Sequence, residues 1–146
     1  MRLLRPFARI FAGAASAGQT GRRMMPSAQP VILLLEDDAA TRELYRRELG
    51  RTFAVVACGS EQDAAEQLAA GGVDALVLEP AALDDLGWAF VARLRRRLPH
   101  LPIVVCSILD VRGRSAELGA SAYLIKPVTP AVLANTLSTV LGDLVS

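Results

Sequence analysis

The chain has 146 residues, of which 52% are hydrophobic and 21% are charged, so its composition excludes a disordered chain. Its formal net charge of +1 gives no general basis for binding nucleic acid. No apolar run reaches the roughly 18 residues that a membrane-spanning helix needs. This length suits one domain with a single core.

Residues 1–29 hold five arginines and no acidic residue. Their start resembles a signal peptide only loosely, because Arg9 and Gly13 interrupt a short apolar patch. We predict a flexible basic N-terminal tail over 1–29, with Met24 or Met25 as alternative starts and a weak amphipathic membrane anchor as the other interpretation. Residues 30–146 are predicted to form one domain after this tail.

Five short apolar runs then alternate with five segments that carry helix signals. Apolar runs of this length are typical of parallel strands covered on both faces. The predicted strands are 31–35, 53–57, the stretch 74–80, 103–106 and 122–125. The predicted helices are 38–49, 60–71, 86–97, 111–118 and 129–141.

Side chains with capping chemistry mark the ends of these helices. Asp38 and Thr129 are the expected N-caps of the first and last helix. Ser60 with Asp63 three residues later resembles a capping box, and Gly142 is expected to end the last helix. The alternation predicts an α/β fold with a parallel sheet and helices on both faces. Because the chain stops after the last helix, we expect a stand-alone module.

Polar side chains follow four of the predicted strands, at the edge of a parallel sheet where ligands bind. They are Glu36, Asp37, Glu79, Ser107 and Lys126. Two carboxylates about 5 Å apart repel by roughly 3 kcal/mol at an effective dielectric constant of about 20, so a positive partner is expected. Lys126, the only lysine among 16 basic residues, is one candidate, and a bound Mg²⁺ is the other.

The order of these elements and residues resembles the receiver domain of bacterial response regulators. The similarity covers about 31–141 and includes L-L-L-E-D-D after the first strand and G-A-S-A-Y-L-I-K-P around the fifth. It implies a flavodoxin-like, doubly wound five-stranded sheet of order 2-1-3-4-5. It also implies that the acids on the metal side would be Glu36, Asp37 and Glu79. The residues in contact with the phosphoryl group would be Ser107 and Lys126, and the switch aromatic would be Tyr123.

In that family the acid after the third strand is a phosphoryl-accepting aspartate, whereas this chain has Glu79. The extra methylene moves the carboxylate roughly 1.5 Å further out. Because an error near 1 Å can cost about 100-fold in rate, we expect Glu79 to be a poor acceptor. We expect it instead to hold Lys126 and Ser107 in a partly activated arrangement.

Other departures point to a changed switch. Leu83 stands where the family usually has proline, and Ile108 is bulkier than the small residue usual there. The segment 107–119 is shorter than usual, and Gly113 weakens its helix. An altered output surface is therefore expected.

The resulting hypothesis is a cytoplasmic pseudo-receiver that is not an enzyme and acts by protein–protein interaction, without binding nucleic acid or membrane. Its partner would be a histidine kinase, a downstream signalling protein, or a second copy bound through the face formed by 111–118, 122–125 and 129–141. The alternative is a working Mg²⁺-dependent phosphoacceptor in a phosphorelay. A small α/β nucleotide-binding enzyme is a third reading, but no Gly-rich phosphate loop follows the first strand.

Three further interpretations concern residues outside this edge. Cys58 and Cys106 are expected to be small buried hydrophobic residues, and Trp88 to belong to the core. The arginine-rich run 93–97 is interpreted as a solvated face near the negative end of its helix.

Overall fold

The computed structural model of the protein describes residues 29–79, 84–107 and 112–145. The predicted tail up to residue 28 lies outside these ranges, as do Leu83 and Ile108. The described strands are β1 (Val31–Leu35), β2 (Ala54–Cys58), β3 (Ala75–Leu78), β4 (Ile103–Ser107) and β5 (Ala122–Ile125). The described helices are α1 (Ala39–Leu49), α2 (Glu61–Ala70), α3 (Asp84–Arg97), α4 (Arg112–Glu117) and α5 (Pro130–Val145).

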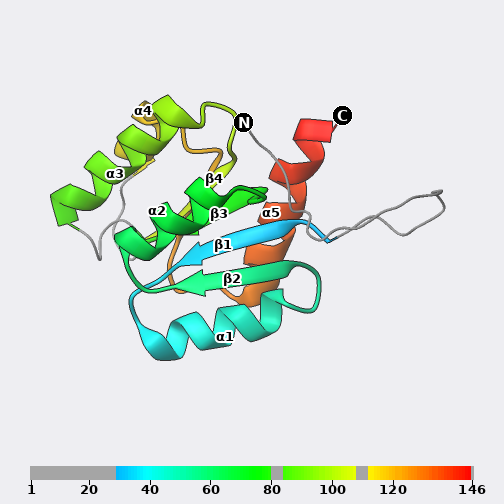
Figure 1. Ribbon diagram of the computed structural model, residues 1–146. Coiled ribbons are helices and arrows are strands. Elements are labelled where there is room, and N and C mark those ends of the chain that lie inside the picture. The colour runs from blue at the N-terminus through cyan, green and yellow to red at the C-terminus, as the bar shows by residue number, and fades with distance from the viewer. Residues whose placement is uncertain (1–28, 80–83, 108–111, 146) are drawn as a thin grey trace.

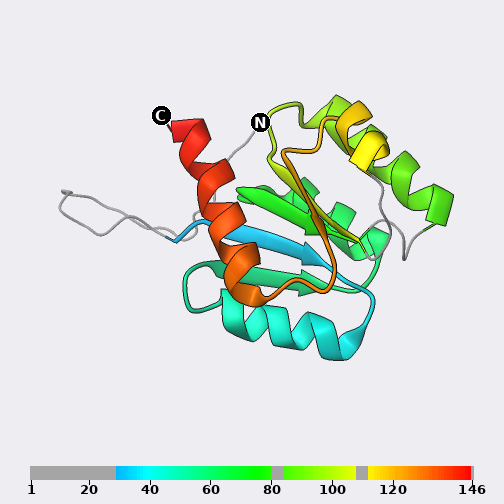
Figure 2. The same ribbon diagram turned by 180° about the vertical axis from the view of Figure 1, so that it is seen from behind.

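The strands form one parallel sheet in the order β2-β1-β3-β4-β5, which confirms the predicted fold (Figure 1). Helices α1 and α5 cover one face, where Tyr45 and Leu137 pack against Ile32. Helices α2 and α3 cover the other face, where Phe90 packs against Leu33 (Figure 2 shows the molecule from the side of α1 and α5). Both faces of each central strand are thus buried, as the apolar runs predicted.

The three predicted N-caps are present. Asp38 accepts the Thr41 backbone N–H at 2.8 Å and Ser60 accepts that of Asp63 at 3.1 Å. Thr129 Oγ1 accepts the Val132 backbone N–H at 3.2 Å. Each cap satisfies a donor that the first helical turn leaves without a partner.

The predicted end of the last helix is wrong, because α5 continues through Gly142 to Val145. Glycine ends a helix most readily when it turns left-handed, but the positive-φ glycines of the described chain are Gly71, Gly72 and Gly119. A right-handed glycine costs a helix only about 1 kcal/mol, which does not stop it.

Strand β2 begins one residue later than predicted. Phe53 precedes it, and its backbone N–H donates to the Leu49 carbonyl at the end of α1 at 2.9 Å. The Phe53 ring is nevertheless buried in the core, so the apolar run begins one residue before the strand does.

Both cysteines and Trp88 are buried, as predicted. Burial raises the pKa of the Cys58 thiol to about 11 and that of Cys106 to about 12. Neither thiol is therefore a reactive thiolate near neutral pH.

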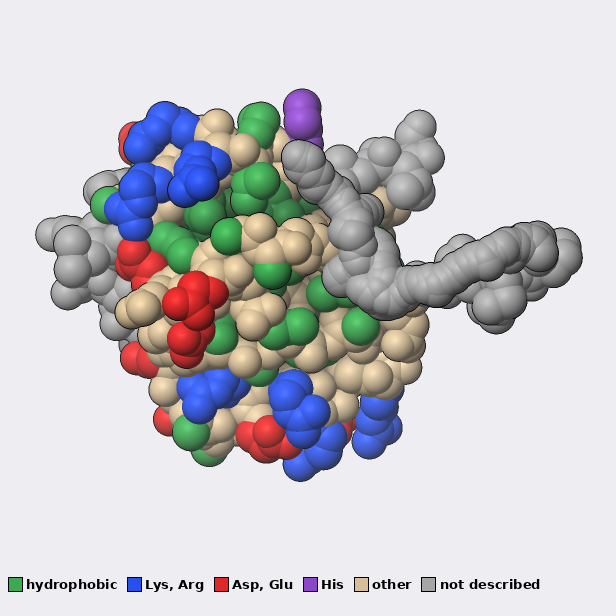
Figure 3. Space-filling model, viewed as in Figure 1, with side chains coloured by type: hydrophobic (Ala, Val, Ile, Leu, Met, Phe, Trp, Pro, Cys, Tyr) green, Lys and Arg blue, Asp and Glu red, His purple; other side chains and the backbone are tan. Residues whose placement is uncertain are grey.

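The arginine-rich run of α3 is only partly a solvated face, so that interpretation needs correction. Arg93 reaches across to Glu61 of α2 at 2.7 Å, and Arg95 is half-buried. Arg96 and Arg97 are exposed as expected. Figure 3 shows basic side chains gathered over the end of α3, with acidic side chains over the neighbouring α2.

Candidate functional site

The register of the sheet brings the predicted acids together. Leu35 of β1 pairs with Leu78 of β3, so the next residues, Glu36 and Glu79, leave the sheet at the same edge. Ser107, the last residue of β4, pairs with Ile125 of β5, and Lys126 follows Ile125 directly. Both carboxylates are nearly inaccessible, with side-chain exposures of 5% for Glu36 and 7% for Glu79.

Lys126 lies between these two carboxylates. Its Nζ is 2.6 Å from Glu36 Oε1 and 3.5 Å from Glu79 Oε2, and its side chain is 14% exposed. We call these three residues the acidic pocket. Burial lowers the pKa of Lys126, but the hydrogen bond and charge of Glu36 and the charge of Glu79 outweigh it, so the pKa lies above its ordinary value. The ammonium group is therefore charged at neutral pH, and it is the positive partner that the clustered acids required.

The backbone around Lys126 is fixed by β4 and by α1. The Lys126 N–H donates to the Ser107 carbonyl at 2.8 Å, and the bond from Lys126 to Pro127 is cis. The buried carbonyl of Val128, the residue after Pro127, accepts a hydrogen bond from the Tyr45 hydroxyl at 2.7 Å. Burial raises the pKa of Tyr45, so its hydroxyl keeps the proton that it donates. Tyr45 thus ties α1 to the loop that positions Lys126.

Replacing Tyr45 by phenylalanine is expected to lower the free energy of unfolding by about 1–3 kcal/mol, because the Val128 carbonyl would stay buried without its donor. Urea unfolding measures this change. Thr139→Val is the matched control: it removes an exposed hydroxyl that donates to the Asn135 carbonyl at 3.0 Å. The control should change stability by less than about 0.5 kcal/mol. An equally small change for Tyr45→Phe would contradict this role.

Arg42 is a second basic residue at this edge, and the sequence reasoning missed it. Its Nη1 donates to the Glu36 carbonyl at 2.8 Å and lies 3.5 Å from the Asp37 carbonyl. A Cβ at Gly59 would lie 2.6 Å from the same nitrogen, so glycine after β2 leaves room for the guanidinium. The signal was its place one turn into α1, since helical side chains lean toward the N-terminus.

The other predicted site residues occupy different environments. Ser107 is fully buried, and Tyr123 is half-buried against the core cluster under α2 and α3. Asp37 is exposed, and Asp38 is the cap of α1, as expected. Hydrogen bonds from Thr41 hold the pKa of Asp38 below its ordinary value. Nowhere in the described ranges do three His, Cys, Asp or Glu residues gather closely enough to hold a metal ion.

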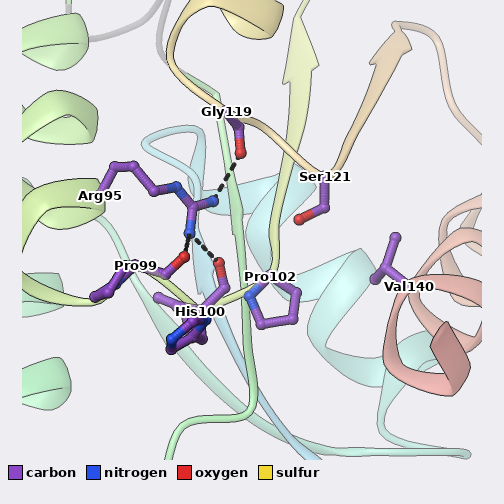
Figure 4. A pocket seen from close by; sticks show the side chains of 8 residues that line it. Arg95, Pro99, His100, Pro102, Gly119, Ser121 and Val140 are labelled. Atoms are coloured by element: carbon purple, nitrogen blue, oxygen red, sulfur yellow. Dashed lines mark hydrogen bonds between the residues drawn. The ribbon is translucent and has the colours of Figure 1, made fainter. Parts of the chain in front are cut away.

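A cavity of about 470 Å³ lies at the opposite edge of the sheet, before β4 and β5 begin. Figure 4 shows Arg95 reaching into this region from α3. Its guanidinium donates to the carbonyls of Leu101 at 2.7 Å, Pro99 at 3.0 Å and Gly119 at 2.8 Å. Arg95 thus joins the loop 99–101 to the turn at Gly119, and this is a structural role. None of the helices described here is long and apolar enough to cross a membrane.

Comparisons with known proteins agree with this geometry. The sequence profile of the response regulator receiver domain family matches residues 32–138. The transcriptional regulatory protein CusR of Escherichia coli K12 is 31% identical over 114 residues, which are 75% of this chain and 50% of CusR. The cyclic di-GMP phosphodiesterase response regulator RpfG of Xanthomonas campestris is 29% identical over 118 residues, which are 75% of this chain and 31% of RpfG.

Solved structures show the same fold. A CheY-like response regulator receiver domain protein from Methanospirillum hungatei has a TM-score of 0.74 at 18% identity, and covers 80% of this chain and 96% of its own. A sensor protein from Polaromonas has a TM-score of 0.69 at 29% identity, and covers 78% of this chain and 97% of its own.

Proposed function

The chain belongs to the response regulator receiver domain family, and from this premise we propose that it is a pseudo-receiver that signals without being phosphorylated at Glu79. The family acts in two-component signalling and is generally not enzymatic. Receiver domains interact with histidine kinases and other proteins, so the proposed output is a protein–protein interaction.

The single observation that carries this proposal is that the acid after β3 in the acidic pocket is a glutamate, Glu79. Glu79 is buried, and its Oε2 lies 3.5 Å from Lys126 Nζ. A nucleophilic carboxylate must reach a phosphoryl group in line, and the extra methylene displaces it by roughly 1.5 Å. The charge on Glu79 instead engages the lysine permanently, which fixes one state of the pocket.

A partner surface is proposed at α4, β5 and α5. Ile125 of β5 and Val132 of α5 are each 48% exposed, which is high for large hydrophobic side chains. Apolar contacts of this kind suit a protein partner or a second copy of the chain. The association would not depend on a phosphodonor.

A working phosphoacceptor is the second candidate. Its support is that Glu36, Ser107 and Lys126 remain at the same edge of the sheet. The two candidates differ in whether the pocket responds to phosphorylation.

Two-dimensional amide NMR of the parent chain separates them. We expect the resonances of Ser107, Tyr123 and Lys126 to stay unchanged when a small phosphodonor and Mg²⁺ are added together, relative to Mg²⁺ alone. The Lys126 amide donates to the Ser107 carbonyl, so its resonance is expected to shift if this edge of the sheet rearranges. Shifts confined to this edge of the sheet would favour the working phosphoacceptor.

A further inference from the structure

Both carboxylate oxygens of Glu36 already have donors from the chain itself. Glu36 Oε1 accepts the Lys126 ammonium at 2.6 Å, and Glu36 Oε2 accepts the Asp38 backbone N–H at 3.1 Å. Glu79 Oε2 faces the same ammonium at 3.5 Å. Each oxygen of the buried Glu36 carboxylate thus has the hydrogen-bond partner that a buried polar atom requires without a metal ion.

The loop that carries these acids is occupied as well. The Arg42 guanidinium bonds the Glu36 carbonyl at 2.8 Å and lies 3.5 Å from the Asp37 carbonyl. The Asp38 carboxylate accepts the Thr41 N–H at 2.8 Å. Two cationic side chains, Lys126 and Arg42, therefore contact this loop.

A divalent cation does not fit this arrangement. Receiver domains typically bind Mg²⁺ at the phosphorylation pocket, and Mg²⁺ requires near-octahedral oxygen ligands at about 2.0–2.1 Å. With Lys126 Nζ 2.6 Å from Glu36 Oε1, an ion bound to that oxygen would lie close to the ammonium and be repelled by its charge. The exposed Asp37 does not join Glu36 and Glu79 in a group of three potential ligands within the described chain.

We propose that the bridge Glu36–Lys126–Glu79 takes the place of a divalent cation. The bridge closes the pocket to metal ions until either Lys126 or Glu79 is changed. This inference rests on the proposed function, in which Glu79 is a permanent acid of the pocket. The longer side chain of Glu79 brings its carboxylate to Lys126, and an aspartate there would end roughly 1.5 Å short. The lysine supplies a compact positive charge that the two acids share.

Mn²⁺ binding tests this, with the electron paramagnetic resonance signal of free Mn²⁺ as the readout and no phosphodonor present. Mn²⁺ is a suitable probe because it shares the preference of Mg²⁺ for carboxylate oxygens. We expect both Lys126→Met and Glu79→Asp to bind Mn²⁺ at least about tenfold more tightly than the parent chain, a difference of about 1.4 kcal/mol. Arg46→Met is the control, because it removes an exposed cation paired with Glu43 and leaves the pocket intact.

Equal affinity of the parent and both variants would overturn the inference, and so would the failure of folded Glu79→Asp to bind. That variant keeps every charge, so it remains informative if Lys126→Met does not fold. A parent chain that binds Mn²⁺ as tightly as the variants but does not accept a phosphoryl group would contradict only this inference. Phosphorylation of the parent at Glu79 would contradict the proposed function.

Discussion

Replacing Glu79 by aspartate is expected to make the pocket accept a phosphoryl group at least about 100-fold faster than the parent chain does. The shorter side chain withdraws its carboxylate by roughly 1.5 Å, which restores the length of the acceptor expected at this position. The carboxylate also moves away from Lys126, which lies 3.5 Å from Glu79 in the parent chain. This movement opens the pocket to Mg²⁺. Intact mass spectrometry after incubation with acetyl phosphate and Mg²⁺ measures the rate of labelling.

Glu79→Gln is the matched control for this experiment. It keeps the length of the glutamate but lacks the negatively charged nucleophile, so it should remain unlabelled. If Glu79→Asp labels no faster than Glu79→Gln, the extra methylene is not what prevents phosphorylation.

Replacing Lys126 by methionine is expected to lower the free energy of unfolding by about 3–5 kcal/mol, because the change leaves two buried carboxylates without their shared cation. Methionine keeps most of the length of the side chain, so the loss reports on charge more than on packing. Guanidinium unfolding in the presence of a chelator measures it. The chelator matters because Mg²⁺ would stabilise this variant if it bound in place of the ammonium.

Arg46→Met is the control for the loss of a cation. Arg46 and Glu43 form an exposed pair, with side-chain exposures of 48% and 58%, so its removal should cost less than about 1 kcal/mol. The double variant Lys126→Met/Glu36→Gln should recover part of the stability, since one uncompensated charge is gone. If Lys126→Met costs no more than Arg46→Met, the lysine does not neutralise the buried acids.

The fold and the centre of the pocket could be predicted from the sequence because they follow from strand ends. Glu36, Glu79 and Lys126 each come directly after an apolar run, and parallel strands bring such positions to one edge. The need for a cation followed from the number of acids there. Between the two candidate cations, the geometry favours the lysine, which lies 2.6 Å from Glu36.

Residues on helices were harder to predict, because their targets lie on distant segments. Tyr45 reaches a carbonyl 83 positions later in the chain, and nothing next to it in sequence indicates that bond. Arg95 stands among arginines that are solvated, yet its guanidinium joins the turn at Gly119. For Gly142, local propensity indicated a helix end, but the cost of one glycine was too small to stop α5.

Signalling by this pseudo-receiver depends most on Glu79 holding the pocket in one state without accepting a phosphoryl group. The most direct measurement is the intact mass of the parent chain after incubation with acetyl phosphate and Mg²⁺, under conditions that fully label Glu79→Asp. We predict that the parent chain keeps its unmodified mass. A stoichiometric phosphoryl adduct that maps to Glu79 would contradict the account.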